Sequence, residues 1–300
     1  MAMNPTKVYL SGSKFLLAAI ISFSVACSPE KKKTDPSEFN NAQSQRAKDV
    51  ISTIGKIPPP AEIPYIIQST GADFNPNIVN SPSKYQSYTI SAKKAAFNLG
   101  VYATDIGYLS SYGKTQEAIT YLDVCLKLTE TIGAKDAVDF KAVERFEKNL
   151  SKPDSLASII NELISSSDKY LKDNDRNNIA ALVVSGTFIE ALYIATQIIA
   201  TYPKNMLPDD MRLQVLSPLV QTLAKQKDSL KDVIALLESV DNKDEWEIAT
   251  INSLQELYDN YTQFDPMGKI SDNRGNEVLN DQVLTRLSIQ VDSIRTNVVY

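Results

Sequence analysis

The sequence predicts an all-α fold, a multi-helix bundle of antiparallel helical hairpins with one long proline-rich loop. After residue 85, apolar side chains recur every three or four positions, as in Ile251, Leu254 and Tyr258, which is the period of one helix face. We find no convincing strand pattern of alternating apolar and polar residues. Turn and capping residues, such as Gly113 and Pro153, interrupt the periodic segments where helices are expected to stop.

The spacing predicts eight or nine helices, over residues 37–55, 88–112, 114–132, 136–150, 154–173, 176–201, 209–239, 244–264 and 276–298. Pro218 is expected to bend or break the helix over 209–239, since proline removes a backbone hydrogen bond. The helix over 176–201 is the most apolar of the set. We expect it at the centre of the domain and not in a membrane, because Glu190 near its midpoint would be costly in lipid.

The proline-rich loop is predicted over residues 57–84. This segment contains Pro58, Pro59, Pro60, Pro64, Pro76 and Pro82, which are too many for a helix. Its apolar residues, among them Ile67 and Ile78, are too numerous for a free linker, so we expect it to lie against the helical body. It is either a wall of a binding groove or a structural strap that covers a helix face.

The beginning of the chain has the parts of a bacterial lipoprotein signal. Lys7 and Lys14 precede an apolar run over 15–26, which is shorter than the roughly 20 residues of a membrane span and is followed by Cys27. We therefore expect a signal peptide over residues 1–26 and lipid attachment at Cys27. The alternative is an ordinary signal peptide or an uncleaved anchor, with Cys27 incidental.

The predicted mature protein is a tether over residues 27–36 followed by a single all-helical domain over residues 37–300. The tether carries Lys31, Lys32 and Lys33 between two prolines, a polar composition typical of flexible linkers. A lipid on Cys27 would hold the domain at the membrane. We expect an outer-membrane lipoprotein of the cell envelope, on the periplasmic face or at the cell surface.

Composition argues against several function classes. The chain has no histidine, the usual base of serine and cysteine triads and the usual ligand of catalytic zinc sites. With Cys27 assigned to the lipid, Cys125 is the only other cysteine, and its helical spacing with Tyr121 and Leu128 predicts a core side chain. The formal net charge of −5 offers no basic stripe for phosphates. We therefore predict no metal, no cofactor and no nucleic-acid partner.

Two acidic residues on apolar helices are the candidate catalytic pair, Asp105 and Glu190. If their helices pack together, the two carboxyls could act as acid and base in glycoside hydrolysis. The alternative is that each is hydrogen-bonded to a tyrosine or a backbone group in an interior network. Tyr102, Tyr108 and Tyr193 lie on the same helices and are candidate ligand-binding residues, because tyrosine rings can furnish a stacking surface for sugars.

Two parts of the chain resemble known families. Residues 113–128, GKTQEAITYLDVCLKL, resemble the second half of a tetratricopeptide repeat, where small residues let paired helices approach. No period of about 34 residues is sustained, so we expect isolated tetratricopeptide-like hairpins and no regular solenoid. Residues 97–108, FNLGVYATDIGY, together with runs over 115–118 and 173–183, resemble a family of uncharacterised predicted lipoproteins of Bacteroidota. That resemblance implies an all-helical secreted domain on a lipid anchor and assigns no activity.

From these observations we expect a lipid-anchored envelope protein that binds or scaffolds a protein, a glycan or another small molecule, and the balance favours a protein that is not an enzyme. One alternative is a carboxylate-dependent hydrolase that acts on glycans. It would be favoured by Asp105 and Glu190 in one solvent-reachable cleft, and burial of either away from any cavity would argue against it. The other alternative is a purely structural envelope lipoprotein.

Overall fold

A computed structural model describes residues 62–135, 140–149, 176–205 and 207–300 of the chain. Within these residues 77% are helical and no strand is formed, which confirms the predicted all-α class. The predicted signal peptide, Cys27, the tether, and the helices expected over 37–55 and 154–173 lie outside the described residues.

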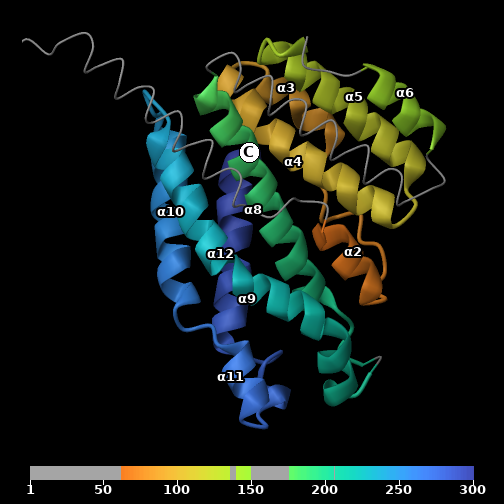
Figure 1. The fold of residues 1–300 in the computed structure, drawn as a ribbon, viewed down its shortest axis with the longest axis vertical. Coiled ribbons are helices and arrows are strands. Elements are labelled where there is room, and N and C mark those ends of the chain that lie inside the picture. Colours follow the sequence, from red (N-terminus) through yellow and green to blue (C-terminus); the bar gives the residue numbers. More distant parts are fainter. Residues whose placement is uncertain (1–61, 136–139, 150–175, 206) are drawn as a thin grey trace, which may run out of the picture.

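The described elements follow the predicted order along the chain (Figure 1). They are α2 (Glu62–Ser69), the 3-10 turn η1 (Pro82–Lys84), α3 (Tyr85–Tyr88), α4 (Ala92–Ser111), α5 (Thr115–Thr131), α6 (Phe140–Lys148), α8 (Asn177–Thr201), α9 (Asp209–Ser239), α10 (Glu245–Tyr261), α11 (Pro266–Ser271), the 3-10 turn η3 (Gly275–Glu277) and α12 (Gln282–Val299).

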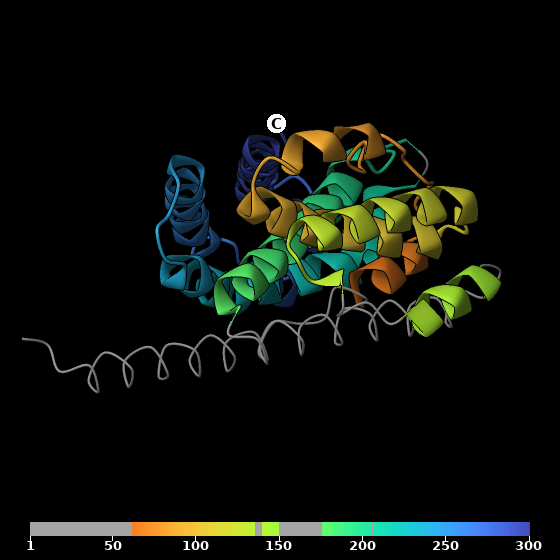
Figure 2. The ribbon, with the colours of Figure 1, turned by 90° about the horizontal axis from the view of Figure 1, so that it is seen from above.

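Helix α8 lies at the centre of the described helices and packs against α4, α9 and α12 (Figures 1 and 2). Helix α5 covers α4 on the side away from α8, and α10 packs on α9 and α12. Among the described helices only α8 is long and apolar enough to cross a membrane, and 78% of its most apolar window is buried by the rest of the protein. This burial is that of a core helix, as the sequence predicts.

Helices α4 and α8 cross at two glycines, and they share the most extensive contact of any described pair. A Cβ atom on Gly100 would overlap the backbone of α8, and one on Gly186 would overlap the carbonyl oxygen of Phe97. The hydroxyl of Thr104 lies between the two backbones, 3.0 Å from the carbonyl oxygen of Gly100 and 3.3 Å from that of Thr187. The two helices can approach this closely because neither glycine has a side chain.

Three sequence predictions about element boundaries need correction. Part of the loop predicted over 57–84 is helical, since α2 tolerates Pro64 in its first turn, where no internal hydrogen bond is lost. Of the bend or break predicted at Pro218, the break does not occur, because α9 runs through it from Asp209 to Ser239. The last helix begins later than residue 276, at Gln282, because the carboxylate of Asp281 caps it by accepting a hydrogen bond from the backbone N–H of Val283 (2.9 Å).

Candidate functional site

Residues 70–81, which we call the strap, connect α2 to η1 and lie along α4. The hydroxyls of Tyr102 and Tyr108 on α4, and of Tyr112 directly after it, bind the strap backbone at three points. Tyr112 donates to the carbonyl of Ala72 (2.7 Å), and Tyr102 donates to the carbonyl of Ser81 (2.8 Å). Between them, the hydroxyl of Tyr108 accepts a hydrogen bond from the backbone N–H of Asn75 (3.0 Å). This part of the predicted loop therefore lies against the helical body, as expected.

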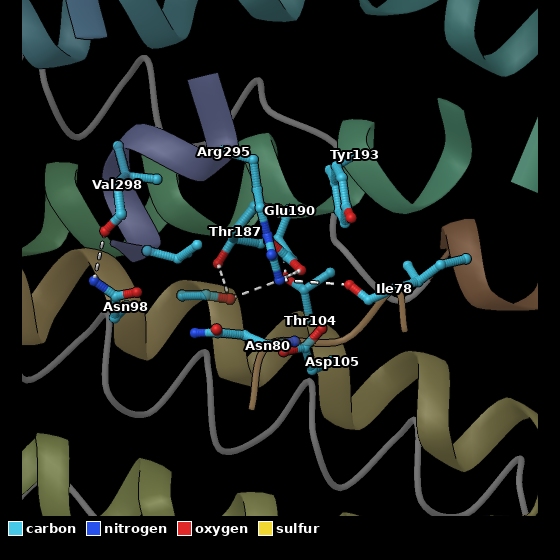
Figure 3. A network of polar contacts seen from close by, with 12 residues as sticks. Ile78, Asn80, Asn98, Thr104, Asp105, Thr187, Glu190, Tyr193, Arg295 and Val298 are labelled. Atoms are coloured by element: carbon cyan, nitrogen blue, oxygen red, sulfur yellow. Dashed lines mark hydrogen bonds and ion pairs between the residues drawn. The ribbon is translucent and has the colours of Figure 1, made fainter. Parts of the chain in front are cut away.

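A buried ion pair joins α8 to α12 beneath the strap (Figure 3). Arg295 donates two hydrogen bonds of 3.0 Å to the two carboxylate oxygens of Glu190, one from Nε and one from NH2. The NH2 group also lies 3.4 Å from the strap carbonyl of Ile78, and the guanidinium lies 4.5 Å from the ring centroid of Tyr193. The Glu190 side chain is 0% exposed, so this is a desolvated, bidentate pair.

Asp105 of α4 brings a second carboxyl to the same cluster, and it is also 0% exposed. Its Oδ2 accepts a hydrogen bond from the strap N–H of Asn80 (3.0 Å). Burial is the main cause that raises the pKa of Asp105 well above its ordinary 3.8, and the negative charge of Glu190 raises it further. The charge of Arg295 and the hydrogen bond from the Asn80 N–H oppose this rise.

One guanidinium balances one carboxylate, so one of the two buried carboxyls must hold a proton. Glu190 makes both hydrogen bonds with Arg295, which assigns the proton to Asp105. Among the described residues no donor reaches Asp105 Oδ1. That oxygen can therefore carry the proton, and the negative charge of Glu190 favours the neutral form of Asp105.

The end of α12 is tied to the same region by amide and hydroxyl groups. Asn98 of α4 donates from Nδ2 to the carbonyl of Val298 (3.2 Å), which Figure 3 shows. Tyr88 donates to the carbonyl of Val299 (2.8 Å) and accepts a hydrogen bond from Asn80 Nδ2 (3.1 Å). The strap, α3, α4, α8 and α12 thus meet around one polar interior.

The structure brings together the two acidic residues that the sequence singled out. Asp105 and Glu190 face each other in Figure 3. Asp105 accepts from a strap backbone N–H, a kind of partner that the sequence analysis expected, whereas Glu190 binds a guanidinium, which it did not expect. Tyr102 and Tyr108 are fully buried, and Tyr193 is nearly so. Their rings face the interior in this conformation, where two of the hydroxyls bind the strap.

Two members of the cluster were missed from the sequence, Arg295 and Asn80. A signal for Arg295 was present, because it lies four residues after Val291 and directly beside Ile294, on the apolar face of α12. No comparable signal marks Asn80, because its contribution to the cluster is the backbone N–H that donates to Asp105. Cys125 is buried in the core as predicted, and burial raises the pKa of its thiol.

No group of three or more histidine, cysteine, aspartate or glutamate side chains that could hold a metal ion occurs among the described residues. The cluster itself has the chemistry of a structural network. Its carboxyls have no exposed surface, and its guanidinium is bound by Glu190 and lies beside the strap carbonyl of Ile78. The strap, a segment of the same chain, covers it.

Neither the family models, nor the curated proteins, nor the solved structures give a match to this chain. The resemblances to Bacteroidota lipoproteins and to tetratricopeptide hairpins therefore stay predictions. Function has to be argued from the geometry of the cluster and from the sequence around Cys27.

Proposed function

We propose that this protein is a lipid-anchored helical binding or scaffold domain of the cell envelope, attached to the outer membrane through Cys27. The observation that carries the proposal is the complete burial of Asp105 and Glu190, the candidate catalytic residues. Their charges and hydrogen bonds are directed at Arg295 and at the strap. We infer that they hold the fold together, which leaves the outer surface of the domain for recognition.

The hydrolase alternative asks for a different arrangement. A glycosidase acid pair flanks the bond to be cleaved, with the carboxyls roughly 5 to 9.5 Å apart and open to substrate. Here Asp105 and Glu190 are both fully buried, and the strap N–H of Asn80 bonds Asp105 directly. A raised pKa on one of two neighbouring carboxyls is typical of a catalytic acid, and it is equally the result of burying two acids beside one base. The absence of exposure makes us favour the binding or scaffold function.

The anchor is tested by metabolic labelling with an alkyne-tagged fatty acid in a bacterial host that processes lipoproteins. We expect label on the full chain and none on Cys27→Ser. The matched control is Cys125→Ala, which removes the buried cysteine and should keep the label. Label on Cys27→Ser, or an unlabelled wild-type protein, would refute the lipid anchor.

The binding function is tested by thermal-shift measurements with glycan fragments, peptidoglycan fragments and peptides, because a ligand of the folded state raises its melting temperature. Each compound is recovered afterwards and its mass measured. A concentration-dependent shift with an intact compound supports a binding domain. Cleavage that Asp105→Asn abolishes would establish the hydrolase instead.

A further inference from the structure

The strap differs from the other walls of the buried cluster in how its backbone is satisfied. Helices α4, α8 and α12 make their hydrogen bonds internally, so they stay intact when a neighbouring side chain moves. The strap has only local hydrogen bonds of its own, such as that from the N–H of Ile78 to the carbonyl of Asn75 (3.3 Å), and side chains of other elements hold it to the cluster. The carbonyl of Ile78 faces Arg295, and the N–H of Asn80 donates to Asp105. It is therefore the wall that a change in the cluster can move most easily.

We propose that the proton on Asp105, buried beside Glu190, fastens the strap, and that loss of this proton opens the strap while α4, α8 and α12 stay packed. The geometry behind the proposal is a pair of fully buried carboxyls served by one guanidinium, with the strap backbone bonded to both sides of the cluster. This is a conformational device inside the domain, and it does not depend on what the domain binds.

The groups that face Asp105 provide no second positive charge. They are Glu190 and Tyr193 of α8, Arg295 of α12, Tyr102 of α4, and Tyr121 and Cys125 of α5. Burial raises the pKa of each of these tyrosines and of the thiol, so they stay neutral when Asp105 titrates. Arg295 is thus the only cation in this set, and it is already engaged by Glu190.

Loss of the proton to solvent changes the cluster from neutral to one net negative charge without access to water. Hydrating the new charge requires an opening, and the strap is the wall whose backbone is not held in a helix. An open strap would also release the hydroxyls of Tyr102 and Tyr108, which now bind its backbone. Two of the candidate ligand-binding tyrosines would then be accessible only in the open form.

The test is hydrogen exchange of the full chain in detergent micelles, followed by mass spectrometry between about pH 6 and pH 9. Rates are corrected for the known pH dependence of unprotected amides. If Asp105 ionises only in the open strap, the opening equilibrium rises by up to about tenfold per pH unit, since one proton is released on opening. We expect this rise in peptides covering residues 70–81, with peptides of α8 remaining protected.

Asp105→Asn is the decisive variant, because the asparagine side chain keeps the shape of the aspartate and stays neutral at every pH. The corrected hydrogen-exchange rates of the strap peptides in this variant should not change with pH. Asp123→Asn is the matched control, since the Asp123 side chain is 59% exposed and pairs with Lys127 on α5. It should behave as wild type. Wild-type strap rates that are independent of pH, or that change together with those of α8, would overturn the proposal even if Asp105→Asn did not fold.

Discussion

Among the described residues, two glutamates are fully buried and paired with a cation, and their surroundings differ. Glu247, in the first turn of α10, bonds Lys93 of α4 (2.8 Å), whose side chain is 22% exposed. Glu190, in the middle of α8, bonds Arg295, whose side chain is only 8% exposed, and it has the carboxyl of Asp105 beside it.

The comparison teaches that charge balance, more than burial, sets the behaviour of each pair. At Glu247 one acid meets one base that still reaches water, and a backbone N–H of the capping box, that of Asp244, supplies a further hydrogen bond (2.6 Å). At Glu190 two acids meet one base in the interior, so a proton becomes part of the structure. The Glu247 arrangement stabilises the start of α10. The Glu190 arrangement makes the packing of α4, α8, α12 and the strap depend on the protonation of Asp105.

The largest effect is expected when both interior carboxyls are replaced. The double variant Asp105→Asn/Glu190→Gln leaves Arg295 buried without an anion, which should cost about 3 to 5 kcal/mol of unfolding free energy. Glu190→Gln alone should cost less, because Asp105 can then ionise and pair with Arg295. Denaturant unfolding of the three proteins measures both costs. Single and double variants of equal stability would show that Asp105 does not share the charge of Arg295.

The next effect concerns the glycine crossing that brings Asp105 and Glu190 together. Gly186→Ala places a methyl group against the carbonyl of Phe97, so α4 and α8 must separate, at a cost of about 1 to 3 kcal/mol or more. A useful comparison is Gly113→Ala in the turn after α4, where φ is +64° and nothing lies within 4 Å. That variant should lose about 1 kcal/mol from backbone strain alone. A smaller loss for Gly186→Ala would mean that the helices do not approach this closely.

The third expected effect is a dependence of stability on pH. The pKa of Asp105 is raised on folding, so its protonated form is favoured in the folded state and its contribution is complete below the ordinary pKa of 3.8. The contribution is lost as pH rises from there through the raised value, with a slope of up to about 1.4 kcal/mol per pH unit. Asp105→Asn should remove this slope. Unfolding curves at a series of pH values measure it, and an unchanged slope in the variant would assign the proton elsewhere.

The smallest effect on stability is expected at the ion pair between Lys93 and Glu247. Glu247→Gln keeps an oxygen that can accept from the N–H of Asp244, and Lys93 can turn to water, so the loss should be about 1 kcal/mol. Denaturant unfolding of Glu247→Gln and of the Glu190 variants under the same conditions compares the two losses of unfolding free energy directly. A cost at Glu247 as large as that of the double variant would mean that burial alone, without the excess carboxyl, explains both sites.

The helices themselves were largely predictable, and the contacts between them were not. The apolar period located α5, α8, α9 and α10 within a few residues, because helix formation and capping depend on neighbours along the chain. Nothing local indicated that Pro64 would lie in the first turn of α2, since the loop prediction weighed the number of prolines and not their position in a turn.

The candidate site shows the same division. Asp105 and Glu190 stood out in the sequence because each is an acid on an apolar helix, but only the packing of α4 on α8 places them together. Their cation is 105 residues away from Glu190, on a helix whose contact with α8 no spacing rule predicts. The strap bonds Asp105 through the backbone N–H of Asn80. Every residue except proline has such an N–H, so the strap sequence does not indicate this bond.

By itself the sequence determined the all-α class, the approximate extent of the helices, the central place of α8 and the acidic pair to examine, because these follow from periodicity and composition. The tertiary structure decided which acid pairs with Arg295, which acid is left to hold the proton, and which segment covers them. The physical reason is that these outcomes depend on distances between groups far apart in the chain and on the balance of charge in a space without water.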